Sequence, residues 1–173
     1  MRIATWNVNS IRTRKAFVID FLHNADIDVV LMQETKCRDD QFPLEDFESA
    51  GYEVAHFGLN QWNGVGIASR LPLEDMEQGF PGMPGFTKNP EEEPATEARA
   101  ISATVDGLRL CSVYVPNGRA LDDPHLDYKL RWLEALGEHY RSYQDQPGAL
   151  PVAIGGDFNV APLDSDVGDP AFL

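Results

Sequence analysis

The sequence is poor in basic residues and in cysteine, and it has no long hydrophobic segment. Only 14 Lys and Arg residues stand against 28 Asp and Glu residues, which gives a formal net charge of −14. The two cysteines, Cys37 and Cys111, are isolated, so we expect reduced, packed thiols rather than a zinc cluster. The longest apolar stretch, residues 149–154, is much shorter than the ~20 residues that cross a bilayer. We therefore expect no targeting segment, no membrane association and a cytoplasmic location.

The acidic balance also argues against a nucleic-acid partner, because duplex binding depends largely on Lys and Arg displacing counterions. This argument is weakened by two facts: net charge is a sum over the whole chain, and bound divalent cations can reverse the sign of a local site. The length of 173 residues and the hydrophobic content of 43% predict one globular domain with a substantial core. No repeat, low-complexity segment or linker interrupts the chain.

Hydrophobic patterning predicts strands and helices that alternate along the chain. Strands are expected at 2–7 and 28–34, with a helix between them whose apolar residues lie at 18, 21, 22 and 25. The continuous apolar run of the second strand is typical of a parallel α/β sheet covered on both faces. Further along we expect a short helix at 43–50, strands at 52–57, 65–69, 100–105 and 108–114, a surface loop at 79–94, a helix with an apolar stripe at 126, 130, 133, 136 and 140, and a strand at 152–154.

The last of these strands leads into the most informative segment of the chain, residues 151–162. Two glycines, Gly155 and Gly156, follow the apolar run and let the backbone pass close to a neighbour or a ligand. If the chain stays extended, Asp157 and Asn159 point the same way, because side chains two residues apart share a face. A carboxylate beside an amide suits a hard metal ion or a phosphate.

Five polar residues lie at the carboxyl ends of predicted strands: Asn7, Glu34, Tyr114, Asp157 and Asn159. A single sheet would bring all five to one rim, where ligands of α/β proteins collect. Oxygen ligands of this kind favour Mg²⁺ and predict metal-assisted phosphoester hydrolysis. Asp157 would take a proton from water, while Tyr114 and Asn159 would donate hydrogen bonds to phosphoryl oxygens. Taken singly, each residue also has an ordinary explanation as a turn former or a solvated strand end.

Five segments of the chain match a known family in their order and spacing. They are 5–12 (Thr-Trp-Asn-Val-Asn-Ser-Ile-Arg), 31–36 (Leu-Met-Gln-Glu-Thr-Lys), 63–67 (Asn-Gly-Val-Gly-Ile), 113–117 (Val-Tyr-Val-Pro-Asn) and 155–162 (Gly-Gly-Asp-Phe-Asn-Val-Ala-Pro). Together they resemble the exonuclease III type of apurinic/apyrimidinic endonuclease, within the endonuclease/exonuclease/phosphatase superfamily. The resemblance runs through essentially the whole chain.

The resemblance implies an α/β fold, the N-terminal half of a four-layer α/β/β/α sandwich of the DNase-I-like kind. It implies Mg²⁺, with Mn²⁺ as a substitute, and a role in base excision repair as a 3′-5′ exonuclease and abasic-site endonuclease. Its partner would be double-stranded DNA with abasic sites or 3′ ends, and the complete enzyme would be a monomer. The implied catalytic residues are Tyr114, Asp157, Asn159 and Glu34, the metal site comprises Asn7, Glu34, Asp157 and Asn159, and the substrate-binding residues are Asn117, Asn63, Gly64 and Arg99.

One departure from the family is large: its Trp-Asp-Tyr-like segment and its terminal Ser-Asp-His do not occur in the sequence. We therefore expect the N-terminal part of such an enzyme, truncated after its first half. Such a part would be weak or inactive alone and would leave one sheet face uncovered as an exposed apolar patch. Two alternatives stay open: a phosphodiesterase acting on sugar phosphates or lipids, which the acidity favours slightly, and a non-catalytic half-domain that binds metal or a partner.

Overall fold

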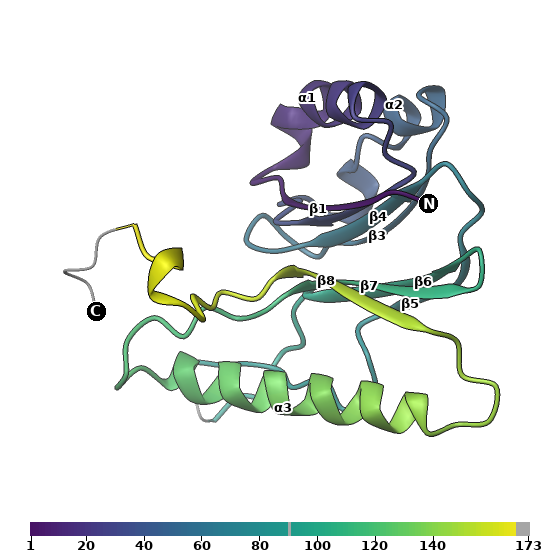
Figure 1. Ribbon diagram of the computed structural model, residues 1–173. Helices are drawn as coiled ribbons and strands as arrows, with labels where there is room; N and C mark the ends of the chain where they lie inside the picture. Colours follow the sequence, from purple (N-terminus) through teal and green to yellow (C-terminus); the bar gives the residue numbers. More distant parts are fainter. Residues whose placement is uncertain (90, 169–173) are drawn as a thin grey trace.

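Two four-stranded sheets pack face to face between two layers of helices in the computed structural model, which describes residues 1–89 and 91–168 (Figure 1). One sheet has the strand order β1-β2-β4-β3 and the other β5-β6-β7-β8. The four layers expected from the resemblance are therefore confirmed. The elements are β1 (Ile3–Asn7), α1 (Ile11–Asn24), β2 (Val29–Gln33), α2 (Leu44–Ser49), β3 (Glu53–Phe57), β4 (Val65–Ser69), β5 (Glu74–Gln78), β6 (Ala100–Val105), β7 (Leu108–Tyr114), α3 (Pro124–Gln144) and β8 (Val152–Asp157), with short 3₁₀ turns at Asp39–Gln41 and Asp164–Asp166.

Each sheet has one parallel strand pair at its edge, β1 with β2 and β7 with β8, and all other pairings are antiparallel. The two parallel pairs lie on the same side of the sandwich (Figure 1). The prediction that a single sheet carries all five polar residues is therefore wrong. Residues 108–114 and 152–157 belong to the second sheet, whose apolar face packs against that of the first.

The core has three layers, and helices of this chain cover both outer sheet faces. Between the sheets, Val29, Leu31 and Ile67 pack against Ile101 and Leu110. The helices α1 and α2 bury apolar residues on the outer face of the first sheet, and α3 does the same on the second. The expected uncovered sheet face is thus absent from the described residues, because the chain itself supplies a helical layer for each sheet.

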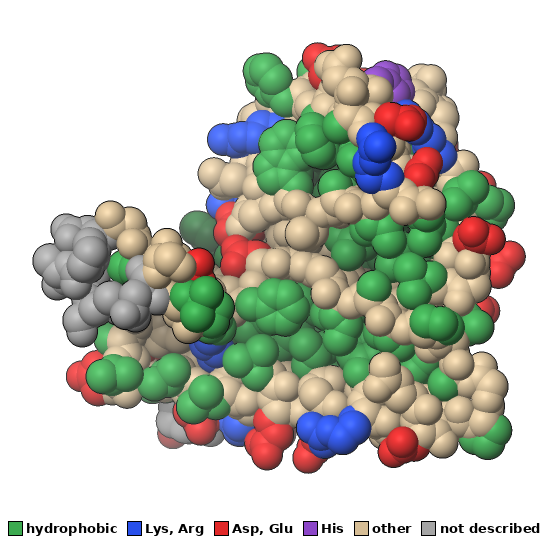
Figure 2. All heavy atoms as spheres, viewed as in Figure 1, with side chains coloured by type: hydrophobic (Ala, Val, Ile, Leu, Met, Phe, Trp, Pro, Cys, Tyr) green, Lys and Arg blue, Asp and Glu red, His purple; other side chains and the backbone are tan. Residues whose placement is uncertain are grey.

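The sandwich has open strand edges instead, at β1 and β3 of one sheet and at β5 and β8 of the other. Within residues 1–89 and 91–168, no strand pairs with the outer edge of β1 or of β8. Figure 2, which views this side, shows hydrophobic side chains exposed among the polar ones. Several large apolar side chains are indeed exposed, among them Ile3, Phe17, Leu130, Phe158 and Leu163. Free edges of this kind can accept further strands.

The long helix α3 begins as the sequence predicts, with the Asp123 side chain accepting a hydrogen bond from the backbone N–H of His125 at 2.8 Å. Its buried face was predicted in part: Leu136 and Tyr140 are buried and Leu133 packs beside them, as expected. Leu130 is 57% exposed, whereas Tyr128 and Trp132 are fully buried. Tyr128 and Trp132 belong to the same buried cluster as Leu136 and Tyr140, and such aromatic side chains bury large areas.

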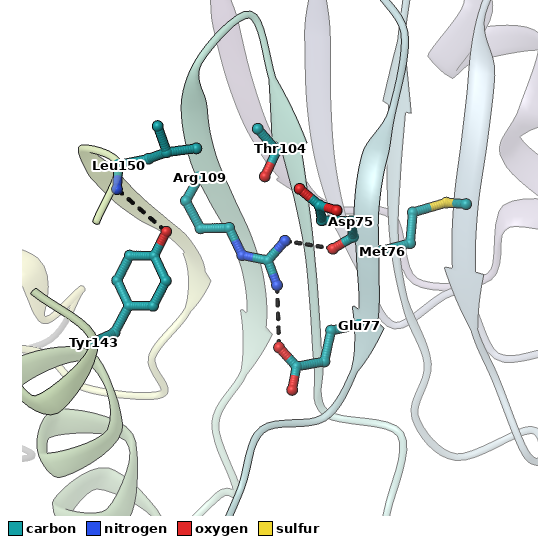
Figure 3. A pocket seen from close by; sticks show the side chains of 7 residues that line it. All are labelled: Asp75, Met76, Glu77, Thr104, Arg109, Tyr143 and Leu150. Carbon is teal, nitrogen blue, oxygen red and sulfur yellow. Dashed lines mark hydrogen bonds and ion pairs between the residues drawn. The ribbon is translucent and has the colours of Figure 1, made fainter. Parts of the chain in front are cut away.

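Strand β5 was not predicted, because its acidic sequence has no apolar alternation and most of it is exposed. It is held by the buried Arg109, whose guanidinium donates to the backbone carbonyl of Asp75 and to Oε2 of Glu77 (Figure 3). These residues line an open cavity of about 400 Å³. Since Arg109 and Tyr114 occupy opposite ends of β7, this cavity is remote from the rim where the candidate site lies.

The two cysteines are free and buried, as expected from the sequence. Burial raises the pKa of Cys37 to about 11, so this thiol is protonated at neutral pH. None of the helices described is both long enough and apolar enough to cross a membrane.

Candidate active site

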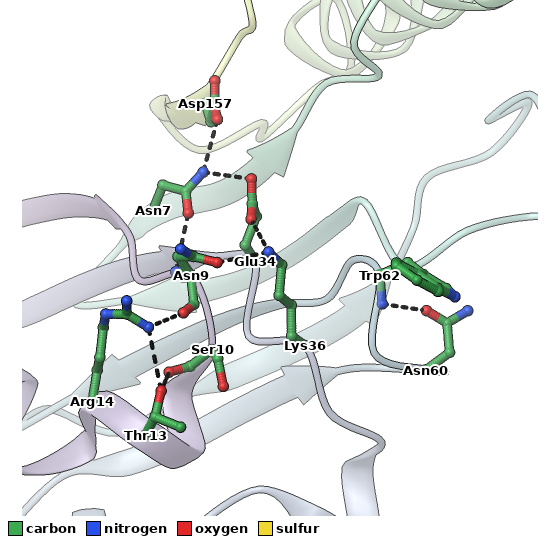
Figure 4. Close-up of polar contacts among 10 residues, drawn as sticks. All are labelled: Asn7, Asn9, Ser10, Thr13, Arg14, Glu34, Lys36, Asn60, Trp62 and Asp157. Carbon is green, nitrogen blue, oxygen red and sulfur yellow. Dashed lines mark hydrogen bonds and ion pairs between the residues drawn. The ribbon is translucent and has the colours of Figure 1, made fainter.

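The side chain of Asn7 joins the two sheets at their common rim. Its Nδ2 donates one hydrogen bond to Oε1 of Glu34 and another to Oδ2 of Asp157, both at 2.9 Å (Figure 4). Its Oδ1 accepts from the backbone N–H of Asn9 at 3.1 Å. Because a carboxylate can only accept, the amide nitrogen must face Glu34 and Asp157. Two carboxylates from different sheets are thereby brought to a single donor.

The two glycines before Asp157 let β8 lie close to its neighbouring strand and to the opposite sheet. A Cβ atom on Gly156 would lie 2.0 Å from the backbone oxygen of Val113 on the neighbouring strand. A Cβ atom on Gly155 would lie 2.8 Å from Cδ1 of Leu31, which belongs to the opposite sheet. The predicted close approach of this backbone is therefore confirmed, and the neighbour is protein on both sides.

Glu34 follows β2 directly and forms an ion pair with Lys36, whose Nζ lies 2.8 Å from Oε2. Lys36 also donates to Oδ1 of Asn9 at 2.6 Å. Burial alone would raise the pKa of Glu34, but hydrogen bonds from Lys36 and Asn7 outweigh it and lower the pKa. Glu34 is therefore ionised at neutral pH. Sequence reasoning did not select Lys36, although a cation two residues after a strand-end carboxylate was a usable signal.

Tyr114 lies beside these carboxylates at the end of β7. Burial, and then the negative charge of Glu34, raise the pKa of Tyr114 to about 12, so its hydroxyl remains a proton donor. The Arg99 guanidinium lies over its ring, 4.9 Å from the centroid, and donates to its backbone carbonyl at 3.2 Å. Arg99 is itself nearly buried and bonded to Glu97. The structure thus places Arg99 as a support for Tyr114.

Asn159 reaches the site by a turn and not by the extended chain that we expected. Strand β8 ends at Asp157, and Asn159 has a left-handed backbone with φ of 51°. Its backbone N–H donates to Oδ1 of Asp157 at 2.9 Å, and its side-chain Nδ2 donates to the carbonyl of Val115 at 2.8 Å. Both bonds fix the Asp157 carboxylate relative to the end of β7.

The two residues of the 63–64 loop differ from the expectation that they contact nucleic acid. Asn63 is fully buried, and its Nδ2 donates to Oε1 of Glu97 at 3.4 Å. Gly64 is also buried, and its backbone oxygen accepts from Thr35 N–H at 3.2 Å. Neither residue faces solvent, because both hold neighbouring segments through hydrogen bonds.

An open cavity of about 410 Å³ lies next to Tyr114. Basic and aromatic side chains line it, although the chain as a whole is acidic. Asn117 is exposed at its wall, and its predicted contact with substrate stays a prediction. Trp62, 71% exposed, and Arg119 were not predicted, although Trp62 directly precedes a motif that carries the resemblance. The lining residues are Trp62, Phe86, Thr87, Lys88, Glu97, Arg99, Tyr114, Asn117, Arg119 and His125.

The donors at the rim fit a hard divalent cation that keeps much of its hydration. Glu34 and Asp157 are within hydrogen-bond distance of one atom, so an ion between them would meet two carboxylates. No cluster of three or more His, Cys, Asp or Glu side chains suited to a metal occurs in the described ranges. That pattern suits Mg²⁺, which needs one or two carboxylates, waters and substrate phosphate, and it does not suit zinc. As oriented, Asn7 offers nitrogen and not oxygen to this position.

A family model described as "Endonuclease/Exonuclease/phosphatase family" matches residues 4–172. The chain belongs to this family. Among curated relatives, the exodeoxyribonuclease of Bacillus subtilis is 28% identical over 98% of this chain. Exodeoxyribonuclease III of Haemophilus influenzae is 25% identical over 97% of the chain. The family resemblance drawn from the sequence is therefore confirmed.

Solved structures of family members superpose on nearly the whole chain. The 3′ phosphatase NExo from Neisseria, bound to a product DNA hairpin, is 37% identical over 99% of this chain with a TM-score of 0.86. An AP endonuclease from Archaeoglobus fulgidus is 38% identical over 99% of the chain with a TM-score of 0.83. The chain spans 63% and 61% of the length of the two curated relatives, and 63% of each of these structures.

Proposed function

We propose that the chain carries the carboxylate and phosphate-binding part of a Mg²⁺-dependent hydrolase of DNA phosphoester bonds. Its activities would be 3′-5′ exonuclease and abasic-site endonuclease cleavage in base excision repair. The observation that carries the proposal is the pair of 2.9 Å hydrogen bonds from Asn7 to Glu34 and Asp157, which assembles one acidic site from two sheets. The relatives support it, since they are named as exodeoxyribonucleases and an AP endonuclease.

Each residue has a chemical task in this proposal. Glu34 and Asp157 would hold Mg²⁺, which when bound neutralises charge that builds up on the phosphoryl oxygens. Asp157 would accept the proton of the attacking water, and its orientation is fixed by Asn7 and by the backbone of Asn159. Tyr114 would donate its hydroxyl hydrogen to a phosphoryl oxygen, which its raised pKa permits. Asn7 would act as the donor that keeps the carboxylates together.

The cavity beside Tyr114 supports a nucleic-acid substrate over a sugar phosphate or a lipid. Trp62 offers an exposed face on which a base can stack, and Arg119 and Lys88 offer charges to a phosphate backbone. These cations stand out because the whole chain carries a charge of −14. The local charge of the cavity, and not the net charge, is what a DNA strand would meet.

The test is binding and turnover of the purified 173-residue chain on a DNA hairpin with a 3′ phosphate and a duplex with an abasic site. We expect Mg²⁺-dependent binding of both, blocked by EDTA, with slow turnover because the family's Ser-Asp-His is not among these residues. A panel with a sugar phosphodiester and a phospholipid headgroup serves as the comparison. Preference for either of those would contradict the DNA assignment, fast DNA cleavage would contradict the slow turnover, and binding without turnover of any substrate would favour the non-catalytic alternative.

A further inference from the structure

Thr35 sits between two residues with unusual backbone conformations. Glu34 has φ of 53° and Lys36 has φ of 52°, and such left-handed conformations cost energy for residues other than glycine. The surrounding structure must therefore hold this segment in place. Two backbone hydrogen bonds do so from the neighbouring loop, Thr35 N–H to the carbonyl of Gly64 at 3.2 Å and Lys36 N–H to the carbonyl of Asn63 at 2.9 Å.

The Thr35 hydroxyl is held from the other side by a histidine that the site described above does not use. Oγ1 of Thr35 lies 2.8 Å from Nε2 of His56 on β3. Nδ1 of His56 lies 2.7 Å from Oδ1 of Asp39, a close polar contact in which the ring N–H is not aligned for a hydrogen bond. The His56 side chain is 6% exposed, and the ring of Phe42 packs on it with centroids 4.5 Å apart. Three side chains from separate segments therefore form one chain of polar contacts that ends at Thr35.

The partners decide where the imidazole proton lies. Asp39 is a carboxylate and can only accept, so the proton of the neutral ring is on Nδ1. Nε2 then accepts from the Thr35 hydroxyl. Burial outweighs the attraction of Asp39 and lowers the pKa of His56, which favours this neutral ring.

Two glycines leave room for this arrangement. A Cβ atom on Gly64 would lie 2.2 Å from Oγ1 of Thr35. A Cβ atom on Gly58 would lie 2.5 Å from Cε1 of His56, and the backbone N–H of Gly58 donates to Oδ1 of Asp39 at 2.7 Å. The Asn63-Gly64 motif thus has a purpose inside the protein, since its glycine makes space for the Thr35 hydroxyl.

Asp39, His56 and Thr35 contact one another in the order of the acid, base and nucleophile of a hydrolytic triad. Thr35 is fully buried, however, so it cannot contact a substrate. We propose that Asp39, His56 and Thr35 form a positioning relay that fixes the backbone of Glu34 and thereby the direction of its carboxylate. This inference rests on the proposed function, because the orientation of the Glu34 carboxylate matters for binding at the metal and phosphate site. The three residues act through Glu34 and do not touch the reacting atoms.

The test compares Thr35→Val, which keeps the shape of the side chain and loses the hydroxyl, with Thr35→Ser, which keeps the hydroxyl. We expect Thr35→Val to weaken binding of Mn²⁺, used alone as an electron-paramagnetic-resonance probe, by about tenfold, the low end of what partners of metal ligands contribute. Amide exchange at Lys36 should become faster in the same variant. Thr35→Ser should stay within about twofold of the wild type in both measurements.

Tyr52→Phe is the matched control. It removes another buried hydrogen bond, from the Tyr52 hydroxyl to the carbonyl of Ile27 at 2.7 Å, but at the opposite end of β2. We expect it to lower the melting temperature while leaving Mn²⁺ affinity and Lys36 exchange unchanged. Equal effects of Tyr52→Phe and Thr35→Val on both readouts would overturn the relay, because the loss would then be general.

His56→Gln provides a second variant in case Thr35→Val does not fold. A glutamine amide can still meet the Thr35 hydroxyl but loses the contact with Asp39, so we expect a smaller increase in Lys36 exchange than His56→Leu gives. Identical exchange in His56→Leu and wild type would refute the relay. If the wild type binds no Mn²⁺, the proposed metal-dependent function fails, and the exchange of Lys36 still decides whether the relay exists.

Discussion

Replacing Asn7 tests the bridge between the sheets most directly. In Asn7→Ala, both hydrogen bonds to the carboxylates of Glu34 and Asp157 are lost. A hydrogen bond to a charged group contributes about 1.5–3 kcal/mol, and the partial exposure of this site favours the lower value. The expected loss is therefore about 3 kcal/mol, or a melting temperature lower by about 6–12 °C for a chain of this size.

Asn7→Asp goes further, because it places a third carboxylate where the donor was. At about 4 Å, two like charges repel by roughly 4 kcal/mol near a protein surface, and here the new group meets two of them. One of the three carboxyl groups must then have a raised pKa in the folded state, so the variant gains stability as the pH falls, opposite to a carboxylate that is paired with a cation. Mg²⁺ should also stabilise Asn7→Asp more than the wild type, since a cation relieves the repulsion.

The assay is thermal unfolding followed by circular dichroism at pH 5 and pH 7.5, with and without Mg²⁺. Asn7→Ala serves as the control that lacks the donor and adds no charge. Because the Asn7 hydrogen bond helps to lower the pKa of Glu34, the stability of Asn7→Ala should fall less on acidification than that of the wild type, but it should not rise as that of Asn7→Asp does, and its response to Mg²⁺ should be the smaller of the two. A shift below about 2 °C for Asn7→Ala would show that Asn7 does not join the sheets. Equal responses of Asn7→Asp and Asn7→Ala to Mg²⁺ would show that the two carboxylates do not share one site.

Three further predictions follow from the same geometry. Asp157→Asn should reduce release of phosphate from a 3′-phosphate DNA hairpin by at least about 100-fold, because an amide cannot accept the proton of water, and it should also weaken the Mg²⁺-dependent binding of the hairpin, because one of the two carboxylates is lost; near-normal turnover would remove Asp157 from the mechanism. Gly156→Ala should destabilise the chain in denaturant titrations, since its Cβ would lie 2.0 Å from the backbone oxygen of Val113, whereas an unchanged midpoint would contradict the close strand contact. The lowered pKa of Glu34 contributes stability that is present above its ordinary value of 4.5 and is lost as the pH falls through the lower folded value. Lys36→Met should therefore flatten the fall in melting temperature on acidification below about pH 4.5, and an unaltered acid profile would show that Lys36 does not stabilise the Glu34 carboxylate.

Local sequence patterns predicted most of the elements because each pattern reports a local burial environment. The β1-α1-β2 unit, the hairpin turn at Asp106 and Gly107, and the start of α3 at Asp123 are all confirmed. Both turn residues have positive φ, 49° and 75°, as the dipeptide predicts. Failures occurred where the deciding contact is long-range. Strand β5 exists because Arg109 and β6 hold an acidic edge, and no periodicity in its own residues reports that.

The sequence predicted which residues form the candidate site, but it did not predict how the two sheets arrange them. Strand-end polar residues identified Asn7, Glu34, Tyr114 and Asp157, and the structure brings them together. Sequence reasoning could not assign them to two sheets, because strand order depends on which apolar faces meet. It also could not show that Asn63 is buried. An asparagine in a turn-rich loop is expected to be exposed, and its hydrogen bond to the distant Glu97 is visible only in the structure.

The position of the site on the sandwich explains why this chain can hold it although the outer edges of β1 and β8 are unpaired within the described residues. Asn7 and Asp157 end the two edge strands, but the atoms that fix them come from inside the sandwich: Glu34 follows the buried β2, and Gly155 rests against Leu31 of the opposite sheet. The packing between the sheets therefore sets the distance between the two carboxylates. Strands added to β1 or β8 would stiffen the ends of these strands without supplying the contact that joins them. It follows that changes in the inter-sheet core should disturb the site more than changes along the free edges.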